Sequence, residues 1–373
     1  MGYLIVRFAK PAQRFLVFDL LRGFFMFGII VNHLALVPNL LLFLTGATRL
    51  WVSFAEGFFI ISGFLLGALN RQRMTRGFGY VFKKLATRAI WLYFWTILLT
   101  LLFTNWGNLM PYGSVKTGLW ELRPDNWPSF FIKTLTFQYS YGWADILPYY
   151  TVFLVFAPFY LWILSRGGVL FLLLINFGIW ILRGGNIYSS IQSLYFLGVT
   201  LGYYQIEIGA YWARWSKQAQ DRIKNWTYAG FAVTLVLSIV SVFFFDQLAA
   251  FWGWNEWFVA KNRVLNWYFD KQTVGLGRMI LAPFWLLTGI FLVDRWKKEI
   301  EEMFGWILFT FGKNSLEAYI VHAIVIFPIP YLVNYFGLTG WWWNTVVTVG
   351  AIVGIYVLTI LTVKLKKYLL EIK

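Results

Sequence analysis

The sequence predicts an all-α, multi-pass membrane protein: a bundle of about ten transmembrane helices that forms a single domain over residues 1–373. Three observations support this fold class. Apolar residues make up 60% of the chain and charged residues only 13%, whereas soluble domains carry about 25% charged residues. Apolar runs of roughly 20 residues, the length that crosses a bilayer, recur along the chain. Basic residues are distributed unevenly between the loops that join these runs.

The first predicted span is the apolar run after Arg14. It is too long for a signal-peptide core and carries charged residues, so we expect no cleavable signal peptide. The predicted span at 167–183 is short, and the one at 304–327 has an alternative start near Asn314. The ten predicted spans are 15–37, 50–69, 81–104, 145–165, 167–183, 188–206, 226–245, 274–294, 304–327 and 342–363.

The charge of the loops predicts the orientation. If the N-terminus is cytoplasmic, about two thirds of the 32 lysines and arginines fall on the cytoplasmic side, as expected for a membrane protein with an even number of spans. Both termini are therefore predicted to be cytoplasmic. The net charge of +16 is explained by topology, and we expect the lipid bilayer rather than nucleic acid as the partner of this charge.

Composition excludes several kinds of site. The chain has no cysteine and only two histidines, which rules out disulfides and acyl-cysteine intermediates and leaves no predicted metal site. The predicted outer loops, about 105–144 and 246–273, are rich in Trp, Tyr, Asn and Gly. Such aromatic residues are either interfacial anchors or a platform on which sugar rings stack, and the same two alternatives apply to Trp341, Trp342 and Trp343.

The first predicted span carries the residues best suited to chemistry. Ionisable residues inside a membrane are costly and are kept mainly where they function. His33 follows Arg22 by eleven residues, which places the two on nearly the same helix face, roughly 16 Å apart. Asp19 lies three residues before Arg22, within reach of an ion pair. A neutral imidazole can take the proton of a hydroxyl that attacks a thioester, so His33 is the candidate base, or else a core histidine bonded to a carbonyl.

Other residues of the first three spans could bind substrates. Arg22 either pairs with Asp19 or holds phosphate and pantetheine groups of a donor. Glu56 either orients His33, holds an acceptor hydroxyl or is solvated. Ser62 and Gly63 form a small-residue notch that either packs helices or admits an acyl-pantetheine chain. A basic stretch at the third span either fixes topology or binds nucleotide phosphates, through Lys83, Lys84 and Arg88.

Several motifs resemble a known superfamily. Asp19-Leu-Leu-Arg22-Gly followed by His33 resembles the arginine, ten residues, histidine motif of the integral-membrane acyltransferase-3 superfamily, and the segment from Glu56 through Phe-Phe-Ile-Ile-Ser-Gly-Phe resembles its second-span signature. The chain is most similar to the osmoregulated periplasmic glucan succinyltransferase (OpgC) family. The segments that carry this closer similarity begin at Asp145, Ala157, Phe269 and Gly312.

The resemblance implies a ten-span bundle, a cytoplasmic acyl-CoA donor, transfer to a sugar hydroxyl on the outer side, and Arg22 with His33 as the catalytic pair. Four features depart from the pattern. The proline that follows the histidine closely in the glucan branch is delayed here to Pro38-Asn39. Asn32 precedes the histidine where the glucan branch has aspartate, so it can support the base only as a neutral partner. Leu276 stands where proline is common. His322 fits a related membrane acetyltransferase group better.

Residues of the predicted outer face complete the candidate site. They either cap helices and pair with each other, or hold sugar hydroxyls and an acyl carboxylate. His322 is either a packing histidine or part of this group. The candidates for binding the acceptor or acyl group are Asp145, Asp270, Lys271, Arg278 and His322.

The function expected from these features is O-acyl transfer in the bacterial inner membrane. The donor is succinyl-CoA, with acetyl-CoA as the alternative, the acceptor is a glycan or glucan, and no cofactor is bound permanently. Alternatives are a membrane sugar N- or O-acetyltransferase and a glycan or lipid transporter or flippase, although we find no paired broken helices of the transporter kind. The membrane-bound O-acyltransferase family lacks the Arg22-to-His33 spacing. The oligomeric state, a homo-oligomer included, is left open.

Overall fold

The computed structural model describes residues 16–109, 126–245 and 255–371, together with residues 247, 251 and 253. This part of the chain is helical and contains no strand, which confirms the all-α prediction. The helices of the first half are α1 (Leu16–Leu34), α2 (Leu41–Thr45), η1 (Gly46–Thr48), α3 (Phe54–Met74), α4 (Phe78–Leu109), α5 (Trp127–Leu135), η2 (Gly142–Ala144), α6 (Ile146–Ser165) and α7 (Val169–Ile181). Those of the second half are α8 (Ile187–Tyr203), α9 (Gln205–Ala213), α10 (Lys217–Ile239), η3 (Val240–Phe244), α12 (Asn255–Phe269), α13 (Leu276–Arg295), α14 (Lys297–Lys313), α15 (Ser315–Ile326), α16 (Ile329–Tyr335) and α17 (Trp341–Glu371).

Eight helical segments of the described chain are long and apolar enough to cross a membrane. They coincide with eight of the ten predicted spans. The other two fall on α7 and α8. With 13 residues α7 is shorter than a typical span, and with 17 residues α8 is at the lower limit of about 17–25 residues. The predicted span 304–327 is interrupted at Asn314, where α14 ends and α15 begins, in line with the alternative start proposed from the sequence.

The chain forms two compact units, each assembled from three stretches. The first unit comprises Met1–Phe25, Gly46–Thr75 and Leu161–Gly312, and the second comprises Met26–Thr45, Arg76–Tyr160 and Lys313–Lys373. Because the stretches alternate along the chain, the division does not separate consecutive domains.

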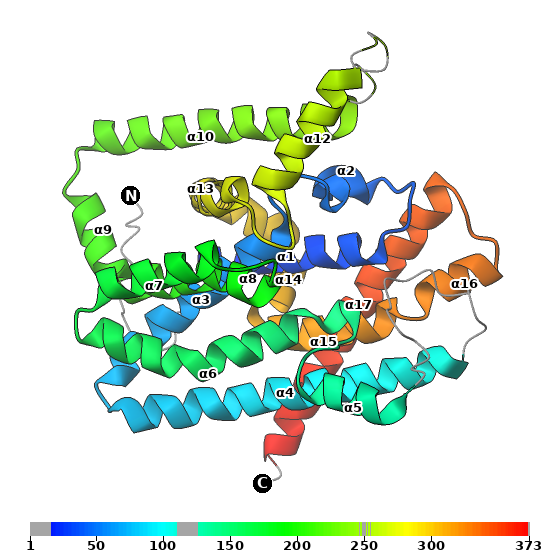
Figure 1. Cartoon of the computed structure of the whole chain (residues 1–373), viewed down its shortest axis with the longest axis horizontal. Helices are drawn as coiled ribbons and strands as arrows, with labels where there is room; N and C mark the ends of the chain where they lie inside the picture. Colours follow the sequence, from blue (N-terminus) through cyan, green and yellow to red (C-terminus); the bar gives the residue numbers. More distant parts are fainter. Residues whose placement is uncertain are drawn as a thin grey trace. The chain divides into compact units, whose positions relative to one another are not determined.

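Within the first unit, α3 and α8 pack at close range along a seam of glycines (Figure 1). A Cβ atom at Gly63 or Gly67 of α3 would overlap the backbone carbonyls of Tyr195 or Val199 of α8. Glycines on α8 meet α3 in the same way. Small residues let helix backbones approach each other, and this approach replaces the hydrophobic driving force that lipid does not supply. The small-residue notch predicted at Gly63 is therefore a helix-packing site.

The start of α1 is held in the same unit by a second close approach. A Cβ atom at Gly23 would overlap the carbonyl of Leu308 in α14, and one at Gly312 would overlap the carbonyl of Asp19. The two glycines therefore seat α14 directly against the turns of α1 that carry Asp19. This contact explains why Gly23 and Gly312 stand in the motifs singled out from the sequence.

In the second unit, the chain after α1 is tied to α17. The buried Asn39 side chain donates to the hydroxyl of Thr348 and, at 3.3 Å, to the carbonyl of Asn344. The Asn344 side chain donates in return to the carbonyl of Pro38 at 3.0 Å. These bonds satisfy polar groups in an apolar environment and fix the segment that follows the last turn of α1.

Candidate functional site

The four predicted residues of the first span all lie on α1, which is continuous from Leu16 to Leu34. His33 is in the last turn and Asp19 in the first turn. The Arg22 guanidinium carbon lies 5.9 Å from the centre of the Phe58 ring, within the range of a cation–π contact. Asp19 is buried, and Asn32 is half-buried beside His33. The spacing that the sequence predicted for Arg22 and His33 is therefore set by one unbroken helix.

The two histidines of the chain meet in the second unit. His33 Nδ1 lies 3.0 Å from His322 Nε2, and the ring centres are 5.2 Å apart. His33 is half-buried, whereas His322 in α15 has 0% of its surface exposed. His322 was predicted either to pack or to bind the acceptor or acyl group, and the structure places it against the candidate base.

Two further groups extend this arrangement. His322 Nδ1 contacts the carbonyl oxygen of Tyr319, one turn earlier in α15. The Tyr319 hydroxyl donates to Asp145 Oδ1 at 3.3 Å and accepts a bond from the backbone N–H of Ile146 at 3.4 Å. Asp145, which the sequence predicts to bind the acceptor or acyl group, is thus linked through Tyr319 to the histidines. We call His33, His322, Tyr319 and Asp145 the histidine cluster.

A second polar cluster lies in the first unit. Glu56, in the first turn of α3, forms an ion pair with Arg278 in the first turn of α13. The other carboxylate oxygen of Glu56 accepts bonds from the backbone N–H and the hydroxyl of Ser53, the reciprocal arrangement of a helix capping box. Glu56 is 2% exposed and Arg278 4% exposed, so the structure excludes the solvated alternative for Glu56. We call Glu56, Arg278 and Ser53 the strap cluster.

Arg278 also holds the segment that precedes α13. Its Nε donates to the carbonyl of Phe269 at 2.6 Å, and its Nη2 donates to the carbonyl of Leu50 at 3.3 Å. The Phe269 ring stacks on Trp51 with ring centres 4.4 Å apart. The Arg278 guanidinium therefore joins the segment at Phe269 to the segment before α3. Its N–H groups can bind several oxygen acceptors at once.

Asp270 forms a hydrogen bond within the segment that precedes α13. Its carboxylate accepts the backbone N–H of Thr273 at 2.7 Å. Burial alone would raise the pKa of Asp270, but the hydrogen bonds from Thr273 and Gln272 and the nearby charge of Arg278 hold that pKa below its ordinary value. Asp270 thus caps a turn, one of the alternatives considered for it. Lys271, next in the chain, is exposed.

The predicted donor-binding residues lie in different environments. Lys83, Lys84 and Arg88 are exposed on the first turns of α4, where a soluble ligand could reach them. Ser62 is half-buried. The neighbouring Gly63 face of α3 is filled by the backbone of α8, so an acyl-pantetheine chain has no room there, and donor binding by Ser62 would use another face of α3.

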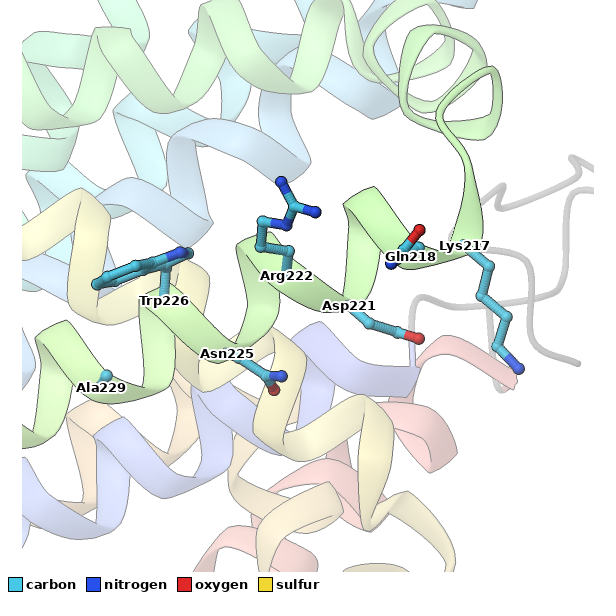
Figure 2. Close-up of a pocket in the computed structure, with 7 residues that line it drawn as sticks. All are labelled: Lys217, Gln218, Asp221, Arg222, Asn225, Trp226 and Ala229. Carbon is cyan, nitrogen blue, oxygen red and sulfur yellow. The ribbon is translucent and has the colours of Figure 1, made fainter.

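A shallow cavity of about 730 Å³ lies along the first turns of α10. Figure 2 shows Arg222 and Trp226 on one side of that helix and Asp221 and Asn225 on the other. None of the residues predicted from the sequence lines this cavity. The basic side chains here resemble those at α4 in charge and exposure, which makes α10 a matched control surface for donor binding.

Two contributors to the clusters were missed in the sequence although signals for them were present. Ser53 and Glu56 have the Ser-x-x-Glu spacing of a capping box, which predicts a helix start with a committed carboxylate. Tyr319 lies three residues before His322, the spacing at which helical side chains share a face. Among the residues that the structure describes, no group of three or more His, Cys, Asp or Glu side chains could hold a metal ion. Residues 110–125, 246, 248–250, 252 and 254 of the predicted sugar platform lie outside the described residues.

Comparison with known proteins gives one match. A family model described as "OpgC protein" matches residues 14–367. The match covers nearly the whole chain, including every residue of both clusters. No curated protein and no solved structure is detectably similar.

Proposed function

Because the chain belongs to the OpgC family, we propose that it transfers a succinyl group from succinyl-CoA to a hydroxyl group of a periplasmic glucan. Family membership supports an acyltransferase, and eight apolar helices of the described chain support a membrane protein. The acyl group, the donor and the acceptor are parts of the proposal, as is a location in the bacterial inner membrane with the donor on the cytoplasmic side.

The proposed reaction is direct transfer. His33 takes the proton of the acceptor hydroxyl as its oxygen attacks the thioester carbonyl carbon. The new carbon–oxygen bond forms, the carbon–sulfur bond breaks, and the coenzyme leaves as a thiolate. The imidazolium of His33 then returns its proton to the thiolate, which leaves free coenzyme, the acylated sugar and the neutral base. General base catalysis of this kind contributes about 10²–10⁴ to the rate.

The position of His33 is the observation that carries the proposal. It is in the last turn of α1, where the partial negative charge of the helix end favours a cation, and a neutral imidazole contacts its Nδ1 at 3.0 Å. A base in this position can acquire a positive charge during the reaction without losing its partner.

Five further site residues take, in this proposal, the roles predicted from the sequence. Lys83, Lys84 and Arg88 hold the nucleotide phosphates of the donor, because exposed basic side chains can pair with phosphate. Arg22, three turns before His33 on α1, holds phosphate or pantetheine groups. Asp145, joined to the histidine cluster through Tyr319, is the acceptor-binding residue that we favour.

The test uses purified protein in lipid nanodiscs, with succinyl-CoA or acetyl-CoA and a β-glucan oligosaccharide, read by mass spectrometry of the glucan. We expect succinylated product, and we expect His33→Ala to lower the rate by about 10²–10⁴ with an unchanged gel-filtration profile. Product from acetyl-CoA alone would replace succinyl by acetyl in the proposal. No product from either donor, or an unimpaired folded His33→Ala variant, would contradict it.

A second arm tests the donor site. Replacing Lys83, Lys84 and Arg88 together by alanine removes three positive charges from α4, and we expect the KM for succinyl-CoA to rise with little change in kcat. The matched control replaces Arg214, Lys217 and Arg222 by alanine. These three exposed basic residues lie between the end of α9 and the first turns of α10, on the same predicted side of the membrane. Equal effects of the two triple variants would show that net charge rather than a phosphate site is responsible.

A further inference from the structure

We infer that His322 is a positioning residue that fixes the tautomer of His33, with the proton on Nδ1 and the basic lone pair on Nε2. The tautomer follows from the contacts alone, whereas its catalytic consequence rests on the proposed function. The inference replaces the two roles considered for His322 from the sequence, packing and ligand binding, by a third one.

The contact between His322 and the Tyr319 carbonyl determines the tautomer of His322. His322 Nδ1 contacts the carbonyl oxygen of Tyr319, and a carbonyl oxygen can only accept a hydrogen bond. Nδ1 of His322 must therefore carry a proton and donate. In a neutral imidazole the other nitrogen then has no proton, so Nε2 of His322 is an acceptor.

The contact between the two histidines then determines the tautomer of His33. Since Nε2 of His322 accepts, the nitrogen that faces it at 3.0 Å, Nδ1 of His33, must carry the proton and donate. In the neutral His33 ring this leaves the lone pair on Nε2. The hydrogen bond of one ring nitrogen thus determines the state of the other, and the chain of donors runs from His33 through His322 to the Tyr319 carbonyl.

The alternative is a doubly protonated His322, which would donate to His33 and reverse its tautomer. His322 has 0% of its surface exposed, and a buried cation is costly unless it is paired. Its two ring contacts are a neutral imidazole and a backbone carbonyl. Burial therefore favours the neutral His322 that the first arrangement requires.

The catalytic consequence is that the base is ready before substrate arrives. When His33 Nε2 takes up the hydroxyl proton, the Nδ1–H of the new imidazolium still donates to His322, now as a charge-assisted bond, which is the stronger kind. The hydrogen bond between the two rings is kept throughout the cycle, so the His33 ring need not turn. A neutral imidazole thus orients the base in a chain where Asn32 precedes His33 and cannot supply a carboxylate.

The decisive experiment is ¹⁵N NMR of nanodisc-embedded protein labelled at histidine, in which only two side chains contribute signals. At neutral pH we expect both rings to be neutral with the proton on Nδ1, the tautomer that free histidine populates less. The His322→Leu variant has one remaining histidine, and we expect its ring to shift toward the Nε2–H tautomer. Wild-type His33 found with its proton on Nε2 would overturn the inference without any variant.

Kinetics supply the second readout. In His322→Gln the side-chain oxygen can still accept from His33 Nδ1, whereas leucine at this position cannot. We expect His322→Leu to lower kcat by about 10–100-fold, the range for partners that orient a histidine at other sites, with both KM values little changed and with most of the rate restored by glutamine. A rise in the acceptor KM, or equal losses for the two variants, would instead support ligand binding or packing.

The two proposals can fail separately. If His33→Ala retained activity while the NMR spectra matched expectation, the assigned base would be wrong and the tautomer assignment would remain. If His33→Ala were inactive while wild-type His33 carried its proton on Nε2, the proposed function would remain and the role of His322 would be lost.

Discussion

The strap cluster and the histidine cluster place polar groups inside apolar helix packing in opposite ways. In the strap cluster two full charges are paired. Arg278 donates hydrogen bonds to Glu56 and to the carbonyls of Phe269 and Leu50. In the histidine cluster the groups are two imidazoles, a backbone carbonyl, a phenol and the Asp145 carboxylate that accepts from the phenol. The first cluster joins segments through charge, and the second joins them through groups whose protons can move.

Under the proposed function, the strap cluster is a structural site and the histidine cluster is a chemical one. Removing the charge of one partner of a buried ion pair strongly destabilises the folded protein, because the other charge stays buried without a partner. A proton transfer that neutralised one partner would have the same cost, so such a pair is poorly suited to general acid–base catalysis. A neutral imidazole can take up a proton and return it during a reaction. We therefore assign catalysis to the histidine cluster, and we assign to the strap cluster the task of holding the segment at Phe269 against the start of α3.

The largest effect that tests this assignment is expected at Glu56. Replacing Glu56 by Gln leaves the Arg278 charge buried without its partner, which typically costs about 3–5 kcal/mol. Arg278→Met leaves the opposite charge. We expect each single variant to lower the thermal stability strongly and the double variant to lose less than the sum, measured by fluorescence-detected gel filtration after heating.

Activity per folded molecule decides what the pair does. We expect folded Glu56→Gln and Arg278→Met to retain most of the acyl transfer rate at low temperature. Loss of transfer with unchanged stability would place Glu56 and Arg278 in the acceptor site, as the sequence suggested, and would break the separation between the two clusters.

A smaller effect is expected at the glycine seam, which stabilises the first unit by backbone contact rather than by charge. Gly63→Ala would place a Cβ atom on the carbonyl of Tyr195, and forced overpacking costs about 1–3 kcal/mol. The matched control is Gly354→Ala on α17, where nothing lies within 4 Å of the added atom. We expect lower thermal stability for the first variant and unchanged or slightly higher stability for the second. Equal stability of the two would contradict close packing of α3 on α8.

Local features of the chain could be predicted because they depend on nearby residues. The first predicted span, 15–37, corresponds to α1 at Leu16–Leu34, and the placement of Arg22 and His33 on one helix follows from apolar length and helical period alone. The break at Asn314 was also foreshadowed as an alternative helix start. The predicted span over α7 was marked as short from the sequence, and the helices over α7 and α8 are of marginal length for a span.

Partners distant in the sequence could not be predicted. His33 meets His322 across 289 positions, and Glu56 meets Arg278 across 222. Helical periodicity gives the face on which a side chain lies but not the helix that covers it, so Glu56 was grouped with the site residues and His322 with ligand contacts. The sequence therefore named candidate chemical groups, whose roles stay predictions, and left their pairing open.

The smallest effect is expected at another ion pair, which lies in the first unit outside both clusters. Arg71, near the end of α3, contacts both carboxylate oxygens of Glu207 in α9 at 2.5 Å. The two side chains are 31% and 51% exposed, so the pair contributes at most about 1 kcal/mol. The hydrogen bond from Arg71 lowers the pKa of Glu207 below its ordinary value.

A lowered folded-state pKa gives a definite sign for the pH dependence. The contribution of Glu207 to stability is fully present above its unfolded pKa, about 4.3, and it is lost as the pH falls through the lower folded value. We expect Glu207→Gln to be slightly less stable than the wild type at pH 7, with the difference vanishing on acidification and shrinking in high salt. The control is Glu302→Gln, which changes an exposed glutamate of α14. A stability difference that persisted in acid would mean that Glu207 contributes through packing and not through its charge. The Arg71–Glu207 pair would then differ from the Glu56–Arg278 pair in how its packing is buried.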